Sequence, residues 1–285
     1  MTGHIPRACV MGHPVAHSRS PLLHGHWLKT LEIPGGYDRA DVTEADFPGF
    51  LRHLRQHGYV GGNVTVPHKQ EAFRMVDERD PAAEAIGAVN TVWYEGERLI
   101  GGNTDAYGFT AHLDACLPGW DNEVRRAVVL GAGGAARAIV HALLTRGLAV
   151  ALVNRTLPRA RELAEHFAMR PSVHAFDELP HALALAGLLV NATSLGMTGR
   201  GSLDVDLTPL PSAAIVYDIV YVPLETAFLK AARERGHRTV DGLGMLLHQA
   251  VPGFAHWFGA TPSVTPDLRA VVASDIRASD GGAGT

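Results

Sequence analysis

Cysteine is scarce in this chain of 285 residues, where Cys9 and Cys116 are the only two. Two cysteines cannot build the disulfide framework of small secreted domains, so the composition favours the reducing cytoplasm. The sixteen histidines are scattered, and none stands in an HExxH motif or beside clustered cysteines. We therefore expect no metal site and no disulfides.

Long apolar runs and runs of one charge are also lacking. Stretches such as Ala182–Ala192 are too short to cross a bilayer, and the N-terminus lacks the basic-then-apolar pattern of an export signal. The formal net charge is −4 without any basic run, which argues against a nucleic-acid or membrane partner. Hydrophobic residues make up 46% and charged residues 19%, as in ordinary globular proteins, and the length predicts about two domains.

Short apolar segments alternate with amphipathic segments along the chain, which predicts an α/β protein with mainly parallel sheets. Ser20 is expected to cap the first helix, with Pro21 at its first position. Pro252 should kink the last strong helix, and Ser279–Thr285 should fray. The expected strands are 8–11, 37–42, 59–66, a hairpin of 91–94 with 98–100, then 127–130, 149–153, 188–191, 215–221 and 239–240. The expected helices are 20–32, 47–57, one starting at Pro67, 135–146, 156–167, 223–235 and 244–258.

A glycine loop, Gly131-Ala132-Gly133-Gly134-Ala135, lies between an expected strand and an expected helix. The spacing Gly131-x-Gly133-x-x-Ala136 matches the dinucleotide-binding fingerprint in its proper strand-to-helix context. The first glycine allows the tight turn, and the second lets the backbone approach a pyrophosphate. The helix N-terminus offers free N–H groups to the phosphates. The motif therefore predicts a Rossmann domain.

The residues at the end of the next strand indicate whether a Rossmann domain binds NAD or NADP. Here they are Asn154-Arg155-Thr156, with Arg159 one turn into the following helix. NAD-specific domains place an acid there, about 20 residues after the loop, to hold the ribose 2′-hydroxyl. A carboxylate would repel a 2′-phosphate, whereas two guanidiniums can bind it with charge-assisted hydrogen bonds. These residues predict NADP.

Polar clusters follow several strands of the first half, and ligands gather at the carboxyl ends of parallel strands. Their hydroxyls and amides, without a metal, suit a polyhydroxylated substrate. Lys69 and Asp105 are the pair among them with acid–base capability: a lysine can protonate the alkoxide that hydride transfer to a ketone leaves. Whether Asp105 shares this proton or orients a substrate hydroxyl stays open. The clusters are Ser18-Arg19-Ser20-Pro21, Gly62 to Lys69, Gly87-Ala88-Val89-Asn90-Thr91 and Gly102-Asn103-Thr104-Asp105.

Through these residues the chain closely resembles the shikimate dehydrogenase family, over nearly its full length from Met11 to about Gly259. The matching segments of the first half are Gly12–Pro21, Asn63–Lys69, Gly87–Thr91 and Asn103–Gly108. Downstream they are the glycine loop, Asn154–Thr156, Asn191–Thr193, Tyr217–Tyr221 and Gly242–Gln249. So many matches in order make a chance resemblance negligible.

The resemblance implies an NADP-dependent oxidoreductase that reversibly reduces 3-dehydroshikimate to shikimate in aromatic amino-acid biosynthesis. It implies that Lys69 and Asp105 form the catalytic pair, and that Ile219 and Gly242 lie near the nicotinamide. It implies that the substrate is held by Ser18, Ser20, Thr65, Asn90, Asp105 and Gln249, with Tyr221 completing the pocket.

The resemblance also implies a discontinuous substrate-binding domain, residues 1–105 plus 243–285, around a Rossmann NADP-binding domain at 106–242. The main alternative is a quinate/shikimate dehydrogenase that uses NAD or both cofactors. The serine pair and the two arginines favour shikimate and NADP. A methylene-tetrahydrofolate type of dehydrogenase and a non-enzymatic sensor are less favoured. The residues leave open whether the protein is a monomer or a homodimer.

Overall fold

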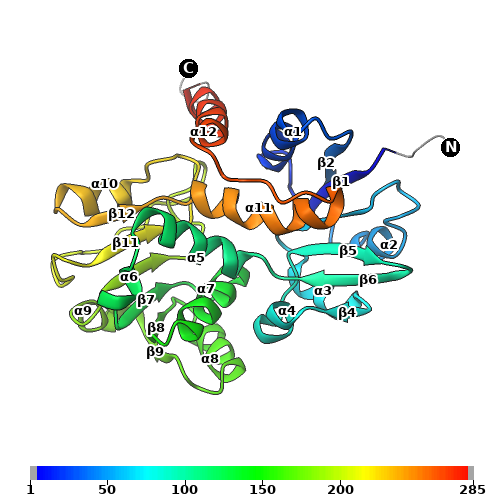
Figure 1. Cartoon of the computed structure of the whole chain (residues 1–285). Coiled ribbons are helices and arrows are strands. Elements are labelled where there is room, and N and C mark those ends of the chain that lie inside the picture. Colours follow the sequence, from blue (N-terminus) through cyan, green and yellow to red (C-terminus); the bar gives the residue numbers. More distant parts are fainter. Residues whose placement is uncertain (1–4, 282–285) are drawn as a thin grey trace. The chain divides into compact units, whose positions relative to one another are not determined.

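A computed structural model describes residues 5–281, which divide into two compact units (Figure 1). The first unit contains the chain through Ala106 and the later segment Leu247–Val272. The second unit contains Tyr107–Leu246 and the chain from Ala273 onward. The functional domain boundaries expected from the sequence, 1–105 plus 243–285 and 106–242, stay a prediction.

The first unit is built around a six-stranded sheet in the order β2-β1-β3-β5-β6-β4. Strand β5 runs antiparallel to β3 and β6, and the other pairings are parallel. The predictions of a mainly parallel sheet and of the β5–β6 hairpin are confirmed. The strands are β1 (Arg7–Gly12), β2 (Gly36–Asp41), β3 (Gly61–Val64), β4 (Glu78–Arg79), β5 (Thr91–Glu95) and β6 (Arg98–Gly102). The helices are α1 (Ser20–Thr30), α2 (Phe47–Arg52), α3 (Lys69–Met75), α4 (Pro81–Ile86) and part of α11 (Leu243–Phe258).

Both faces of this sheet are covered, as the run of apolar residues in β1 requires. Cys9 and Met11 pack on the side of α2 and α3, in one hydrophobic cluster with Phe47 and Leu51. Ala8 and Val10 pack on the other side, in a cluster with Trp257 of α11. With both faces covered, the carboxyl ends of β1 and β3 are left to carry polar loops.

The second unit contains a six-stranded, all-parallel sheet in the order β12-β11-β10-β7-β8-β9. This is the doubly wound order of a Rossmann domain, and it confirms that prediction. The strands are β7 (Arg126–Leu130), β8 (Ala149–Val153), β9 (Ser172–His174), β10 (Leu188–Asn191), β11 (Ile215–Asp218) and β12 (Arg238–Val240). The helices that lie wholly in it are α6 (Trp120–Glu123), α7 (Gly134–Thr145), α8 (Leu157–His166), α9 (Leu179–Leu183) and α10 (Ala227–Glu234). Helix α5 (Asp105–Cys116) leads into it from the first unit.

Several expected element ends are wrong. Arg19, not Ser20, occupies the N-cap of α1, and no side chain caps this helix. Ser20 Oγ instead accepts a hydrogen bond from Ser18 Oγ. Helix α10 begins at Ala227 rather than at 223, because the Thr226 hydroxyl accepts from the Leu229 N–H and caps it. Helix α2 ends at Arg52 rather than at 57, and β11 ends at Asp218 rather than at 221.

Some elements were not expected at all. The largest is α12 (Pro266–Gly281), whose Leu268, Val272 and Ile276 are fully buried. The expected frayed tail is therefore helical through Gly281, and its residues 282–285 lie outside the described part of the chain. Pro252 does lie inside α11, as expected.

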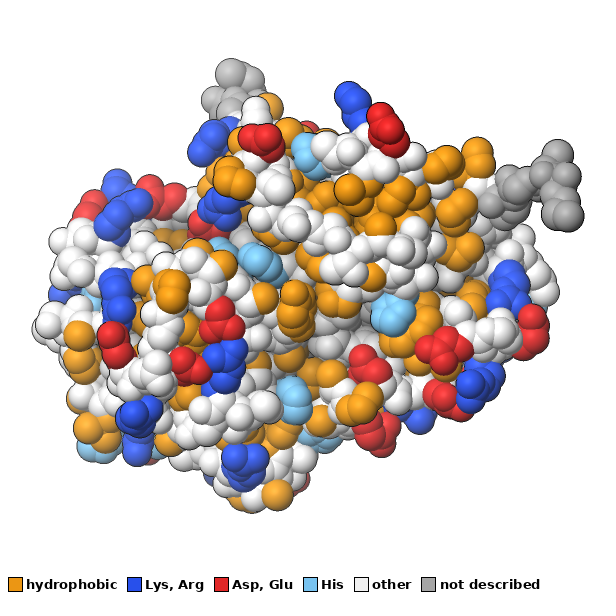
Figure 2. Space-filling model, viewed as in Figure 1, with side chains coloured by type: hydrophobic (Ala, Val, Ile, Leu, Met, Phe, Trp, Pro, Cys, Tyr) orange, Lys and Arg blue, Asp and Glu red, His pale blue; other side chains and the backbone are white. Residues whose placement is uncertain are grey.

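Charged side chains of both signs lie on the face of the molecule that Figure 2 draws. On this face, basic and acidic side chains are interspersed. Within residues 5–281, every helix is too short or too polar to cross a bilayer. The same residues contain no group of three or more histidine, cysteine, aspartate or glutamate side chains arranged to hold a metal ion.

Candidate functional site

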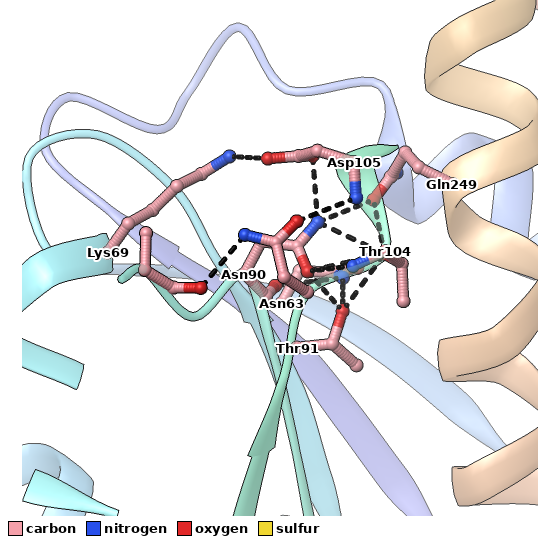
Figure 3. Close-up of polar contacts among 9 residues, drawn as sticks. Asn63, Lys69, Asn90, Thr91, Thr104, Asp105 and Gln249 are labelled. Carbon is pink, nitrogen blue, oxygen red and sulfur yellow. Dashed lines mark hydrogen bonds and ion pairs between the residues drawn. The ribbon is translucent and has the colours of Figure 1, made fainter. Parts of the chain in front are cut away.

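Lys69 and Asp105 meet in an ion pair within the first unit. Lys69 is the first residue of α3 and Asp105 the first residue of α5. Each follows a strand of the sheet, and Nζ of the lysine contacts Oδ2 of the aspartate (Figure 3). The two side chains are largely buried, with relative exposures of 16% and 9%. The acid–base pair expected from the sequence is thus brought together.

Asn90 fixes the other carboxylate oxygen of this pair. Its Nδ2 donates to Asp105 Oδ1 at 2.8 Å and to Thr104 Oγ1 at 3.0 Å. Its Oδ1 accepts from the Thr104 N–H at 2.8 Å and from Thr91 Oγ1 at 2.9 Å. A buried amide with this many partners has one orientation, so Asp105 is held in one orientation as well.

Gln249 joins this network from α11, as Figure 3 shows. Its Oε1 lies 3.4 Å from Asn90 Nδ2 and 3.4 Å from Thr104 Oγ1. The residue is 8% exposed and stands 159 positions after Asn90. The structure therefore unites four of the expected site residues, Lys69, Asn90, Asp105 and Gln249.

Asn63 and Tyr37 extend the network, and sequence reasoning missed both. Asn63 Nδ2 donates to the Asn90 carbonyl at 3.2 Å and to Thr91 Oγ1 at 3.1 Å. Its Oδ1 accepts from the Tyr37 hydroxyl at 2.6 Å. Asn63 stands in a polar cluster at the end of β3, which was a usable signal. Tyr37 lies in a strand without polar motifs, and nothing local marks it.

The serine pair lies in the loop between β1 and α1. Ser18 Oγ donates to Ser20 Oγ at 3.2 Å and accepts from the Ser20 N–H at 3.3 Å. Both residues are buried, at 9% and 5% exposure. Thr65 follows β3, and its N–H donates to the Met11 carbonyl at 2.9 Å. All three expected substrate residues thus stand at the carboxyl ends of the neighbouring strands β1 and β3.

Ile219, Tyr221 and Gly242 belong to the second unit. A Cβ on Gly242 would lie 2.2 Å from the Ile219 carbonyl oxygen, so these two segments cross where only glycine fits. The structure thus brings Ile219 and Gly242 together. Tyr221 is half-buried in the segment after β11, and its part in a substrate pocket stays a prediction.

The glycine loop lines a cavity of about 600 Å³ in the second unit. Gly131 has φ +109°, and a Cβ there would lie 2.9 Å from Thr193 Cγ2. Gly133 is different: a Cβ there would meet nothing within 4 Å, so it faces open space. Helix α7 starts directly after it, with Gly134 and Ala135 in its first turn. A backbone open at Gly133 and free N–H groups at a helix start fit a pyrophosphate.

The expected cofactor-selecting residues line the same cavity. They are Asn154, Arg155, Thr156 and Arg159. Asn154 Nδ2 donates to the Thr156 carbonyl at 2.8 Å and shapes the turn before α8. Arg155 and Arg159 are exposed at the cavity edge, where two guanidiniums can bind a phosphate.

A buried carboxylate, that of Asp218, is linked through Asn191 to Thr193, which lines this cavity. Asp218 is fully buried and accepts hydrogen bonds from Asn191 Nδ2 at 2.9 Å, the Val220 N–H at 3.0 Å and Thr226 Oγ1 at 2.7 Å. Asn191 Oδ1 in turn accepts from the N–H and the hydroxyl of Thr193. Burial raises the pKa of Asp218 to about 6, although these hydrogen bonds act in the opposite direction.

Three family descriptions match consecutive parts of the chain. They are the shikimate dehydrogenase substrate binding domain (residues 10–92), shikimate / quinate 5-dehydrogenase (118–198) and the shikimate 5′-dehydrogenase C-terminal domain (242–272). A curated relative, shikimate dehydrogenase (NADP(+)) of Brucella abortus, is 56% identical over 274 residues, which are 95% of this chain and 94% of the relative.

Solved structures with similar folds span nearly the whole chain. Shikimate 5-dehydrogenase of Thermus thermophilus, in complex with NADP(H) and shikimate, is 36% identical with a TM-score of 0.82, over 96% of this chain and 99% of that one. Quinate dehydrogenase of Corynebacterium glutamicum, in complex with NAD, is 31% identical with a TM-score of 0.85, over 94% of this chain and 99% of that one.

Proposed function

The chain belongs to the shikimate dehydrogenase family, and we propose that it catalyses the reversible, NADPH-linked reduction of 3-dehydroshikimate to shikimate in aromatic amino-acid (chorismate) biosynthesis. The observation that carries this proposal is the buried Lys69–Asp105 pair, whose carboxylate is held by Asn90, which in turn contacts Gln249. Acid–base groups preorganised among hydroxyl and amide side chains suit the oxidation and reduction of a polyhydroxylated ring. The NADP-dependent Brucella relative supports the same reaction.

Lys69 and Asp105 are the proposed catalytic residues. NADP, when bound, supplies or accepts the hydride. In the reductive direction Lys69 Nζ donates the proton, or the positive charge, that the developing alkoxide needs. Asp105 accepts a hydrogen bond from a substrate hydroxyl and orients the ring, while Asn90 keeps its carboxylate from turning.

The substrate-holding residues divide by chemistry. The paired hydroxyls of Ser18 and Ser20 are proposed to hold the substrate carboxylate. Thr65, Asn90 and Gln249 are proposed to hold its ring hydroxyls, with Tyr221 completing the pocket. The burial of four of them, Ser18, Ser20, Asn90 and Gln249, supports these roles, because a hydrogen bond is electrostatically stronger away from water.

The cofactor is proposed to be NADP. The glycine loop and the first turn of α7 would hold the pyrophosphate, and Arg155 and Arg159 the 2′-phosphate. Asn154 and Thr156 would shape the adenosine end, and Ile219 and Gly242 the nicotinamide end. The domain assignment that goes with these roles is 1–105 plus 243–285 for substrate and 106–242 for cofactor.

An assay of shikimate and quinate, each with NADP and with NAD, tests this function. We expect kcat/KM to be highest for shikimate with NADP, by at least tenfold over each other combination. A preference for quinate with NAD would instead support the alternative that the Corynebacterium structure represents. Absence of turnover with all four combinations would overturn both.

Two further proposals concern the setting of the enzyme. We propose a cytoplasmic location, because the chain has only two cysteines, Cys9 and Cys116, and they form no disulfide with each other, as a reducing compartment allows. Its partners are proposed to be small molecules alone, and sedimentation analysis will distinguish a monomer from a homodimer.

A further inference from the structure

Strand β2 lies at the edge of the first unit's sheet and contains none of the residues assigned to substrate above. Tyr37 and Arg39 stand two positions apart in it, so their side chains leave the same face of the sheet. The register confirms this, because Tyr37 pairs with Ala8 and Arg39 with Val10, the two β1 residues that face α11. One face of an edge strand thus presents two side chains toward the polar loops.

Arg39 holds the loop that carries the serine pair. Its Nε and Nη2 both donate to the Ser18 carbonyl, at 3.1 Å and 2.7 Å. The planar guanidinium fixes the direction of that carbonyl, and hence the rotation of the peptide that joins Ser18 to the next residue. The Ser18 hydroxyl then meets both the Ser20 hydroxyl and the Ser20 N–H.

Tyr37 contacts the network of amide side chains through Asn63. Its hydroxyl donates to Asn63 Oδ1 at 2.6 Å, which turns the Asn63 Nδ2 toward the Asn90 carbonyl. The Tyr37 ring is fixed by stacking on the fully buried His24, with centroids 4.0 Å apart and planes 14° apart. Burial lowers the pKa of His24 to about 3 and raises the pKa of Tyr37, so both rings are neutral at physiological pH.

We propose that Arg39 and Tyr37 are positioning residues for substrate. Arg39 sets the geometry of the serine pair, and Tyr37 sets that of Asn63, which contacts the carbonyl of Asn90, the residue that holds Asp105. The proposal rests on the proposed function for its kinetic consequences. The two residues act on different ends of the substrate, so we expect the Arg39 variant to change KM for shikimate and the Tyr37 variant to change kcat.

Arg39 is exposed, so its replacement should leave the fold intact. For Arg39→Ala we expect KM for shikimate to rise roughly tenfold, the effect of one charge-assisted hydrogen bond, with kcat and KM for NADP within about twofold. Arg39→Lys separates positioning from simple attraction of a carboxylate, because it keeps the charge and loses the planar two-nitrogen contact. We expect the lysine variant to behave like the alanine variant.

The matched control is Arg7→Ala, because Arg7 is a surface arginine of the adjacent strand that pairs with Asp38 rather than with the serine loop. We expect its kinetic constants to equal those of the wild type. Wild-type kinetics in Arg39→Ala, or full rescue by Arg39→Lys, would overturn the role of Arg39.

For Tyr37→Phe, which keeps the ring and removes the hydroxyl, we expect kcat to fall about tenfold with KM for NADP unchanged. Tyr94→Phe, a half-buried tyrosine of β5 in the other hydrophobic cluster, is the control. A Tyr37→Phe variant that loses stability but keeps wild-type kcat would show that the hydroxyl is only structural, and would overturn its role.

Amide hydrogen exchange makes the test independent of turnover. In the ligand-free protein, Arg39→Ala should speed exchange across residues 15–20 at least fivefold, and Arg7→Ala should not. If the wild type fails to oxidise shikimate, the proposed function fails, and this exchange experiment still decides on Arg39. Unchanged exchange in Arg39→Ala would overturn the positioning role by itself.

Discussion

The glycine loop allows a sharp test, because an added side chain would meet different surroundings at Gly131 and at Gly133. At Gly131 an added Cβ would lie 2.9 Å from Thr193 Cγ2 and 3.2 Å from the Ala192 carbonyl oxygen, with the backbone at φ +109°. The backbone conformation costs an L-residue about 1–2 kcal/mol, and the crowding adds a cost of similar size. We therefore expect Gly131→Ala to lower the free energy of unfolding by about 3 kcal/mol.

At Gly133 the same methyl group meets nothing within 4 Å. We expect Gly133→Ala to leave the free energy of unfolding within about 0.5 kcal/mol of the wild type. Gly133 lines the cavity where the pyrophosphate is proposed to lie, so an added methyl group should keep the pyrophosphate from the backbone, and the Kd for NADPH should rise about ten- to hundredfold, or roughly 1.4–2.7 kcal/mol.

Urea unfolding followed by circular dichroism measures the first quantity, and NADPH fluorescence titration measures the second. The Kd of the Gly133→Ala variant for shikimate is the control, because shikimate is proposed to bind in the first unit and this Kd should be unchanged. Wild-type affinity for NADPH in Gly133→Ala would refute the placement of the pyrophosphate. Equal loss of stability in the two variants would refute the steric reasoning.

Three other predictions follow from the site. Lys69→Ala should lower kcat by roughly 10²–10⁴-fold with NADPH binding retained, and normal turnover would remove Lys69 from the chemistry. Replacing Arg155 and Arg159 together with glutamine should weaken NADP at least tenfold more than NAD; equal weakening of both would exclude the 2′-phosphate contact. Because the pKa of Asp218 is raised from 3.8 to about 6 in the folded protein, the folded state binds more protons between these values. The contribution of Asp218 to the free energy of unfolding should therefore fall by about 3 kcal/mol as pH rises from about 4 to about 6. Urea titrations at several pH values measure this fall, and the Asp218→Asn variant should not show it.

Local patterns predicted the elements that bury continuous apolar runs. Strands β8 and β10 begin and end where the sequence indicates, because their apolar residues, Ala149–Val153 and Leu188–Val190, follow glycine within two positions and end at an asparagine. The short edge strands β4 and β9, of two and three residues, have too few residues to show a period. Helix α12 was missed although its signals were present: Leu268, Val272 and Ile276 recur every fourth residue, after the Thr265 hydroxyl that accepts from the Leu268 N–H.

The candidate site was predictable where its residues are marked by motifs. Lys69, Asn90 and Asp105 each stand beside glycine or proline in polar clusters, and the structure joins them. The contacts of Tyr37 and Arg39 depend on strand pairing, because each bridges to a residue more than twenty positions away with no local signature. The capping of α1 was wrong for a related reason: Ser20 is engaged by Ser18, so the residue type alone gives a misleading signal.

The side-chain amide of Asn90 makes its hydrogen bonds within the protein, and this affects which ligands the site accepts. Its nitrogen and its oxygen are both engaged by protein groups before any ligand arrives. A substrate hydroxyl must therefore exchange with an internal hydrogen bond, and the gain per contact is only the difference between the two. When an analogue lacks that hydroxyl, the internal hydrogen bond of Asn90 stays in place, and no buried polar group is left without a hydrogen-bond partner. Such a site tolerates deoxy analogues and rejects ligands chiefly for the groups they add.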